Sequence, residues 1–281
     1  MTIDDVVRHC LMALFRNDFF KKQFVLKGGQ WLRLREELRT RLSGDIDFSV
    51  KGKIENPDQF EETLRECISA EFASNGFYAF AFKVDRRPKK RRNGQPDWWG
   101  GWRVSFKLID YDKRTLPRDA LERSAITPQG ANSSVIAIDV SEYEYCESVE
   151  RMKIDAVSIT VYSRALVLLE KLRAICQQHP AYPLKGNLAR SRDYYDIEQL
   201  WRKVVSESAE TTFIKECREH LPGVFAAKEV DLELLQKIFD SEFVKLQESG
   251  WQSVVSTVNN KVADFSFYNE VVRLIVKKLL E

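Results

Sequence analysis

The stretch that decides the fold starts with an apolar run and a glycine pair and ends with two aspartates: Phe24-Val25-Leu26, Gly28-Gly29, and then Arg41-Leu42-Ser43-Gly44-Asp45-Ile46-Asp47-Phe48. The apolar run is typical of a short strand that stops at a glycine turn. Residues 31–42 carry apolar side chains at helical spacing, which predicts an amphipathic helix. Apolar and polar residues alternate from Asp45 to Val50, which predicts a second strand.

The two aspartates of the second strand suggest a cation site. Asp45 and Asp47 are two residues apart, so their carboxylates project from one face, about 6–7 Å apart along the strand. Two such charges repel unless a cation lies between them, and hard oxygen ligands suit Mg²⁺ that also binds phosphates. Gly28 and Gly29 at a helix start offer backbone N–H donors to an anion, and Ser43 adds a hydroxyl. The alternative is purely structural: two turns and a solvated strand edge.

The pattern elsewhere predicts an α/β half followed by a helical half. Further helices are expected at 3–15 and 58–73, with Thr2 as a plausible N-cap of the first. Further strands are expected at 77–84, 102–109, 135–140 and 157–161. After Ser163 only helical patterns follow, at 163–178, 192–205, 209–219, 230–248 and from 254 onward. We therefore expect a catalytic domain at 1–160 and a helical domain at 161–281.

The order strand, Gly-Gly, helix and Arg-x-Ser-x-Asp-x-Asp resembles the nucleotidyltransferase fold of the DNA polymerase β superfamily, in the version of the AbiEii/AbiGii toxin family. Further motifs of that family follow in the expected order. They are Ile136-Ala137-Ile138-Asp139-Val140, Leu169-Glu170-Lys171-Leu172-Arg173-Ala174 and Arg192-Asp193-Tyr194-Tyr195-Asp196-Ile197. One departure is the spacing, because fifteen residues (Gln30 to Gly44) separate Gly29 from Asp45, which we interpret as a longer helix.

The resemblance implies an α/β (α+β) fold with a polymerase β-like mixed sheet and an enzyme that transfers NMP from an NTP to RNA. It implies the 3′ end of tRNA as acceptor, which would block translation, and a toxin role in toxin–antitoxin or phage-defence pairs with a cognate antitoxin. Implied catalytic residues are Asp45, Asp47, Lys171 and Asp193. Implied nucleotide-binding residues are Gly28, Gly29, Ser43, Lys171 and Asp196. Implied ligands of Mg²⁺ (or Mn²⁺) are Asp45, Asp47 and Asp139.

The third metal ligand stays open between two aspartates. Asp139 occupies the polar side of its predicted strand, between Ile138 and Val140. Asp110 ends the strand that starts near Trp102, and it is the rival for the same role. An exposed residue of no function is the alternative for Asp139.

A basic segment suggests nucleic-acid binding. Six cations occur within seven residues, and Trp98, Trp99 and Trp102 follow them: Arg86, Arg87, Lys89, Lys90, Arg91 and Arg92. Cations pair with the phosphate backbone and exposed rings stack on unpaired bases, so this pattern predicts RNA binding. The alternative is a solvated loop whose tryptophans pack on the sheet.

Composition excludes several classes of protein. The 281 residues are 44% hydrophobic and 31% charged with a net charge of +2, which excludes disordered and collagen-like chains. Five scattered cysteines without a Cys-x-x-Cys pair suggest reduced thiols in a cytoplasmic protein rather than a zinc site. We expect no signal peptide and no membrane partner, because no apolar run approaches the ~20 residues of a membrane span.

Two alternatives to RNA modification remain. The same site could transfer NMP or a phosphoryl group to a protein hydroxyl, or the chain could be a non-catalytic module that binds RNA or an antitoxin. The sequence does not choose the NTP, the RNA, the antitoxin or the oligomeric state.

Overall fold

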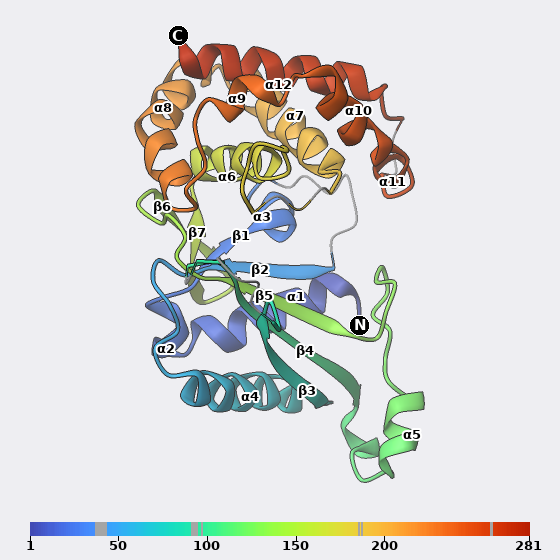
Figure 1. The fold of residues 1–281 in the computed structure, drawn as a ribbon. Coiled ribbons are helices and arrows are strands. Elements are labelled where there is room, and N and C mark those ends of the chain that lie inside the picture. Colours follow the sequence, from blue (N-terminus) through green and yellow to red (C-terminus); the bar gives the residue numbers. More distant parts are fainter. Residues whose placement is uncertain (37–43, 91–94, 97, 185, 187, 259–260) are drawn as a thin grey trace. The chain divides into compact units, whose positions relative to one another are not determined.

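The structure is a computed structural model of residues 1–281, and it describes all of them except 37–43, 91–94, 97, 185, 187 and 259–260 (Figure 1). The chain divides into two compact units. Unit 1 comprises Met1–Trp31, Ser43–Glu144 and Glu150–Val161. Unit 2 comprises Leu32–Leu42, Tyr145–Val149 and Tyr162–Glu281.

The described strands form one seven-stranded mixed sheet in the order β3-β4-β5-β2-β1-β7-β6. Pairing is parallel between β2 and β5 and between β1 and β7, and antiparallel for β1/β2, β3/β4 and β4/β5. The strands are β1 (Val25–Lys27), β2 (Asp45–Ser49), β3 (Phe77–Arg87), β4 (Gly101–Asp110), β5 (Ile136–Ser141), β6 (Val149–Ile154) and β7 (Val157–Tyr162). The central β2, which carries the Asp-x-Asp segment, therefore lies between β1 and β5.

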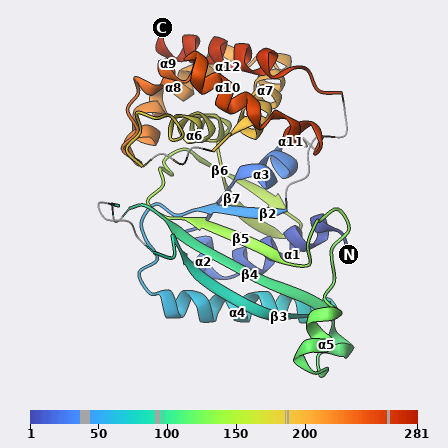
Figure 2. The same cartoon turned by 45° about the vertical axis from the view of Figure 1, so that its right-hand side comes forward.

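Helices of unit 1 cover one face of this sheet (Figures 1 and 2). They are α1 (Ile3–Phe15), α2 (Asp18–Lys21) and α4 (Pro57–Ser74). Aromatic side chains join the layers: Phe15 meets Phe48 of β2 at 6.0 Å between ring centroids, and Phe72 meets Phe106 of β4 at 5.8 Å. Thr2 caps α1 through a reciprocal hydrogen-bonded box with Asp5, as its position predicted.

Three shorter helices complete the part of the chain before β5. α3 (Gly28–Arg35) follows β1 directly. The single turn η1 (Tyr111–Lys113) and α5 (Arg118–Arg123) follow β4, and the backbone N–H of Ile126 then donates to the Leu108 carbonyl at 2.8 Å. The predicted longer helix up to residue 42 lies partly outside the described residues.

Unit 2 is mainly helical. Its helices are α6 (Arg164–Cys176), α7 (Ser191–Ser206), α8 (Glu210–Ala226), α9 (Leu234–Lys237), α10 (Ser241–Ser249), α11 (Trp251–Val255) and α12 (Phe265–Leu280). Ser163 caps α6 through its hydroxyl. Aromatic contacts hold α12 against α7 and α11. The ring centroids of Tyr194 and Phe265 are 5.0 Å apart, and those of Trp251 and Tyr268 are 4.6 Å apart. Glu36, just after α3, accepts two hydrogen bonds of 2.7 Å from Arg164.

The structure confirms the fold class, a mixed sheet with helices followed by a helical C-terminal region. It also corrects details of the expectation. Strand β6 is absent from the sequence prediction because three of its six residues, Val-Glu-Arg-Met-Lys-Ile, are charged and none of the six is buried. The helix expected at 230–248 is two helices, α9 and α10. Within the described residues, no helix is both long and apolar enough to span a membrane.

Candidate functional site

Five charged residues lie next to one another across the sheet, one on each of five neighbouring strands. Lys27 of β1 pairs in register with Asp47 of β2, and Asp47 pairs with Asp139 of β5. Asp139 pairs with Arg103 of β4, which pairs with Asp85 of β3. Residues in register share one face of a sheet, so the five side chains form a single charged row. This row brings Asp47 and Asp139 together, although 91 residues separate them in the chain.

The charged row lies on the face opposite to α1 and α4. Alternation along each strand sends the neighbours of the row, among them Leu26, Phe48 and Ile138, to the other face, where they are fully buried. Because Asp45 is two residues from Asp47, it shares the polar face with the row. The sheet therefore separates a hydrophobic core on one side from a carboxylate cluster on the other.

Arg103 holds two of the carboxylates. Its guanidinium donates to Asp139 at 2.7 Å and lies 3.6 Å from an oxygen of Asp45. Asp45 keeps 56% of its side chain exposed, whereas Asp139 keeps 32%. Burial raises the pKa of Asp139, and the neighbouring Arg103 partly opposes this by favouring the charged carboxylate. The cluster thus contains a cation, Arg103, between Asp45 and Asp139, whereas the divalent cation expected between Asp45 and Asp47 stays a prediction.

Gly28 leaves room for Asp47. A Cβ atom built on Gly28 would lie 2.2 Å from Oδ2 of Asp47, and the φ angle of +72° is one that side-chain-bearing residues rarely adopt. Lys27, the residue before it, is buried and lies 3.6 Å from the carboxylate of Glu144. Gly28 therefore leaves space for the Asp47 carboxylate, and it also begins α3.

The candidate metal ligands lie close to one another in the fold, but not as a finished metal site. Across the described part of the chain, no three His, Cys, Asp or Glu side chains are grouped so that they could hold a metal ion. Asp139 is the neighbour of Asp47 in register. Asp110, the rival third ligand, lies seven residues beyond Arg103 on β4, about 24 Å along the strand, and pairs with Lys113 at 2.6 Å.

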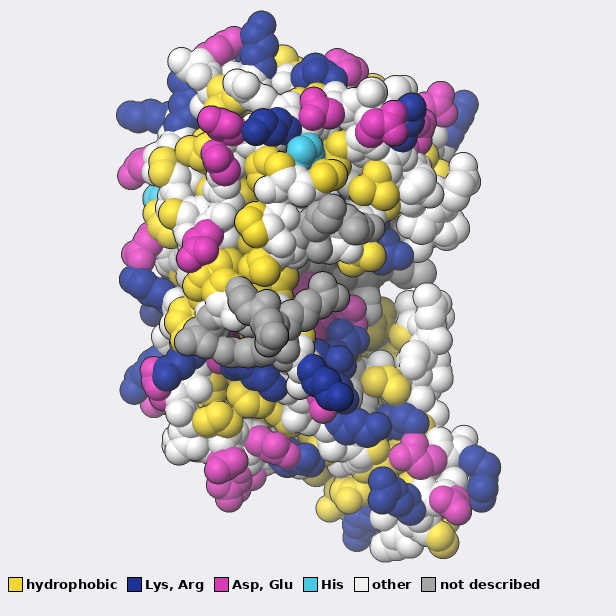
Figure 3. All heavy atoms as spheres, in the orientation of Figure 1, with side chains coloured by type: hydrophobic (Ala, Val, Ile, Leu, Met, Phe, Trp, Pro, Cys, Tyr) yellow, Lys and Arg dark blue, Asp and Glu magenta, His cyan; other side chains and the backbone are white. Residues whose placement is uncertain are grey.

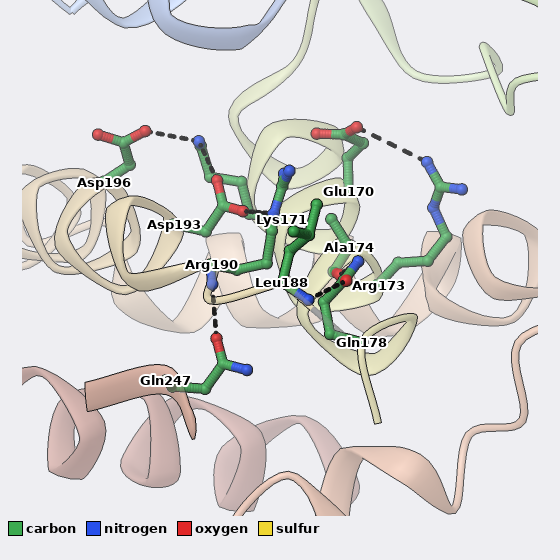
Figure 4. Close-up of polar contacts among 10 residues, drawn as sticks. All are labelled: Glu170, Lys171, Arg173, Ala174, Gln178, Leu188, Arg190, Asp193, Asp196 and Gln247. Atoms are coloured by element: carbon green, nitrogen blue, oxygen red, sulfur yellow. Dashed lines mark hydrogen bonds and ion pairs between the residues drawn. The ribbon is translucent and has the colours of Figure 1, made fainter. Parts of the chain in front are cut away.

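A buried ion-pair cluster occupies unit 2 (Figure 4). Lys171 of α6 donates to Asp193 at 3.0 Å and to Asp196 at 2.7 Å, and both aspartates project from α7. Asp193 also accepts a hydrogen bond of 2.6 Å from Arg190. All three side chains of the lysine–aspartate cluster are at least nine-tenths buried, whereas Arg192 beside them is exposed. The structure thus joins the predicted lysine motif and the predicted second aspartate motif.

The basic segment divides between the two faces of the sheet. Arg86 forms an ion pair with the buried Glu142 and lies 5.2 Å from the ring of Trp102. Arg87 is exposed on the polar face. Lys89 pairs with Asp85 at 3.2 Å, and Lys90 is exposed. Arg91 and Arg92 lie outside the described residues, as does Ser43.

The tryptophans of this region are at least half-buried. Trp102 donates its indole N–H to Glu142 at 3.0 Å and packs 5.8 Å from Phe60 of α4. Trp98 and Trp99 lie 5.9 Å apart, with their rings edge to face. Trp102 therefore belongs to the core side of the sheet, which is the structural alternative that the sequence had left open for it.

Sequence reasoning missed Lys27 and Arg103. Alternation alone places Arg103 between Trp102 and Val104, on the polar side of its strand. What the sequence does not contain is the register that puts Arg103 beside Asp139. Lys27 directly precedes the glycine pair, where a cation next to two predicted carboxylates was a usable signal.

Comparison with known proteins gives a family match and similar folds. The family model described as nucleotidyl transferase AbiEii toxin, type IV TA system, matches residues 10–270. No curated protein matches the chain. Among solved structures, MenT4, a nucleotidyltransferase toxin from Mycobacterium tuberculosis, has a similar fold with a TM-score of 0.54 at 16% identity, over 99% of this chain and 83% of that one. A putative nucleotidyltransferase from Helicobacter pylori has a TM-score of 0.50 at 18% identity, over 99% and 96% of the two chains.

Proposed function

Because the chain belongs to the AbiEii family of nucleotidyl transferase toxins of type IV toxin–antitoxin systems, we propose that it transfers NMP from an NTP to RNA, with the 3′ end of tRNA as acceptor. The observation that carries this proposal is the cluster of Asp45, Asp47 and Asp139 on the polar face of the sheet, beside the glycine-started helix. Modification of the 3′ end would prevent aminoacylation and so stop translation. A cognate antitoxin would be the partner that prevents this.

The donor set fits a divalent cation, Mg²⁺ or Mn²⁺. Carboxylate oxygens are the ligands these ions prefer, and β2 and β5 place Asp45, Asp47 and Asp139 on one face of adjacent strands. We propose Asp45, Asp47 and Asp139 as the residues that would hold it. When bound, the ion would neutralise phosphate charge and lower the pKa of the attacking hydroxyl.

The chain's own groups would position the triphosphate and the acceptor. Gly28 and Gly29 present backbone N–H groups at the start of α3, where an anion is favoured. Gly28 also lets the Asp47 carboxylate approach closely. Arg103 balances part of the carboxylate charge from β4. Ser43 is the further phosphate donor that we propose. Such positioning and charge neutralisation are the main sources of rate in phosphoryl-type transfer.

Lys171, Asp193 and Asp196 are proposed to serve nucleotide binding from unit 2. Two carboxylates and a lysine in a buried cluster hold one another in fixed orientations. Asp193 is further restrained by Arg190. We propose that NTP use depends on the orientation of Lys171, which Asp193 and Asp196 set.

The test is nucleotide incorporation. Purified protein is incubated with total tRNA and each α-labelled NTP in turn, with Mg²⁺ or Mn²⁺, and RNA and protein are then separated. Label in RNA supports the proposal and identifies both the NTP and the acceptor. Label in protein alone, with none in RNA, would instead establish a protein-hydroxyl acceptor. No label in either contradicts the proposed activity and leaves a non-catalytic binding module.

A further inference from the structure

A second group of cations lies on the polar face of the sheet, beyond the aspartates. We call it the basic strip, and it consists of Lys83 and Arg87 on β3, Arg103 and Lys107 on β4, and Arg118 on α5. Lys83 pairs in register with Ser105 and Arg87 pairs with Gly101. Lys83 and Arg87 lie two residues before and two residues after Asp85, which pairs in register with Arg103. Alternation then places the four strand residues on the same face as Asp47 and Asp139.

The members of the strip lie close enough to form one continuous surface. Lys107 forms an ion pair of 2.5 Å with Glu122, which ties α5 to β4. The positive charges of Lys83 and Arg118 also act on Glu122 and help to lower its pKa, although the bond to Lys107 is the main cause. At the other end, the charge of Arg87 acts on Asp139. The strip therefore extends from the aspartate cluster to α5.

Three of the five cations are available to a ligand. Lys83, Arg87 and Arg118 are exposed, and none of them forms an ion pair with another residue in the described ranges. The acids that lie within the strip, Asp85 and Glu122, already have the cations Lys89 and Lys107 as partners. Figure 3 shows Lys and Arg side chains gathered over the part of unit 1 that carries β4 and α5. Such a surface attracts a polyanion.

The exposed part of the strip, at Lys83, Arg87 and Arg118, lacks the aromatic groups that would stack on unpaired bases. The positions that share this face are Tyr78, Phe80, Lys83, Asp85 and Arg87 on β3, Gly101, Arg103, Ser105, Lys107 and Ile109 on β4, and Ala137, Asp139 and Ser141 on β5. Its two aromatic residues lie at the far end of β3, where Phe80 is buried and Tyr78 stacks on it with 6.3 Å between ring centroids. The described residues of this face that are fully exposed are not aromatic. Single-stranded RNA is held by stacking on aromatic rings, whereas an RNA helix is held through phosphates and 2′-hydroxyls. The chemistry of the strip thus favours a base-paired stem.

We propose that the basic strip binds the sugar–phosphate backbone of an RNA stem, so that the end of the stem reaches Asp45 and Asp47. The second half of this statement rests on the proposed nucleotidyl transfer, but the binding itself does not. Contacts to phosphates carry no base specificity, so the strip recognises the shape and charge of a stem rather than its sequence.

The experiment measures binding without any NTP. A fluorescent RNA hairpin and an unpaired RNA of the same length are titrated with protein at several salt concentrations. The variant pair Lys83→Gln/Arg118→Gln removes two exposed, unpaired charges of the strip. The matched control Lys21→Gln/Lys22→Gln removes two exposed charges at the end of α2, on the other side of the sheet. Far-UV circular dichroism and thermal unfolding confirm that both variants are folded.

The wild type and the control variant are expected to bind the hairpin more tightly than the unpaired RNA. The strip variant should lose affinity for the hairpin, and the slope of log K against log salt should fall by about two, one for each lost phosphate contact. An unchanged slope in the strip variant would overturn the proposal and leave the strip to an acidic protein partner. Tighter binding of unpaired RNA would overturn it as well.

The catalytic variant Asp45→Asn separates this inference from the proposed function. If transfer fails in the wild type but the hairpin binds through the strip, the proposed function is wrong and the binding surface stands. If transfer succeeds while Lys83→Gln/Arg118→Gln leaves hairpin binding and its salt slope intact, the proposed function stands and the strip is refuted. Asp45→Asn itself should bind the hairpin with an undiminished salt slope, because it removes no cation.

Discussion

The Oδ2 atom of Asp47 occupies the space that a Cβ atom on residue 28 would need, since the two would be only 2.2 Å apart. Gly28 is thereby required twice, once for its positive φ angle and once for the absence of a side chain. In the sequence the glycine pair and the aspartate pair are two motifs that follow one another. In the structure Gly28 and Asp47 are in direct contact.

Replacement of Gly28 by alanine should therefore displace the Asp47 carboxylate and abolish most nucleotide incorporation. The matched control is Gly76→Ala, because Gly76 also has a positive φ of +83°, but a Cβ atom on it would meet no atom within 4 Å. Both variants should lose stability through backbone strain, by about 1–2 kcal/mol. Incorporation assays and urea unfolding on both proteins check this. Equal activity of the two variants would show that the approach to Asp47 is irrelevant.

Removal of the lysine from the buried cluster of unit 2 should destabilise the protein strongly. Lys171→Met leaves Asp193 and Asp196 in the interior without their shared cation, and breaking a buried ion pair costs about 3–5 kcal/mol. The double variant Lys171→Met/Asp196→Asn restores the charge balance, since Asp193 keeps Arg190. Urea unfolding should show that the second substitution recovers much of the loss. Additive losses would contradict the coupling.

The same double variant distinguishes a structural lysine from a nucleotide-binding one. If the Lys171–Asp196 pair serves NTP binding, the double variant is stable but needs a much higher NTP concentration for half-maximal incorporation. Recovery of both stability and NTP use would limit Lys171 to a structural role.

Replacement of Arg103 should strengthen metal binding at the aspartates. Arg103→Gln removes the cation that now bridges Asp45 and Asp139, so a divalent ion no longer competes with it. Calorimetric titration with Mn²⁺ should give a higher affinity for this variant than for the wild type. Arg65→Gln is the control, because Arg65 pairs with Glu61 on α4. An affinity that is unchanged or lower in Arg103→Gln would argue against a metal site between these carboxylates.

Acidification should destabilise unit 2 through His179. Burial lowers the pKa of this histidine, and its Nδ1 accepts the backbone N–H of Ala181 at 3.1 Å, which requires the unprotonated nitrogen. The folded state thus resists protonation, so the stability contribution is complete above the unfolded pKa of about 6.5 and is lost as the pH falls below it. Thermal unfolding from pH 7.5 to 5 should be less pH-dependent in His179→Gln. Identical pH profiles would exclude His179 as the cause.

The fold was predictable where periodicity was strong. Alternation from Asp45 to Val50 fixed the strand and the common face of its two aspartates, and the helical spacing before Phe15 fixed α1. β6 was not predicted because half of its residues are charged and none is buried, which leaves little apolar alternation to detect. The break between α9 and α10 was not predicted, because apolar residues continue across it with helical spacing.

The sequence supplies the candidate site as a list of residues, which stays a prediction, but it does not supply their arrangement. The paired aspartates, the glycine pair and the lysine and aspartate motifs all follow from local sequence. Register between strands is a long-range property, so the sequence could not show that Asp139 lies beside Asp47 or that Arg103 joins them. For the same reason the basic segment looked like one patch, whereas its alternating residues face opposite sides of β3.

Label incorporation by aspartate variants tests the central claim most directly. Wild-type protein, Asp45→Asn, Asp47→Asn and the control Asp85→Asn, from the same charged row, are assayed with tRNA and the NTP that the wild type uses. All four should unfold at similar urea concentrations. The account predicts that Asp45→Asn and Asp47→Asn lose incorporation by at least a hundredfold, about 2.7 kcal/mol of transition-state stabilisation, while Asp85→Asn retains it. Retained incorporation in either of the first two variants would contradict the account.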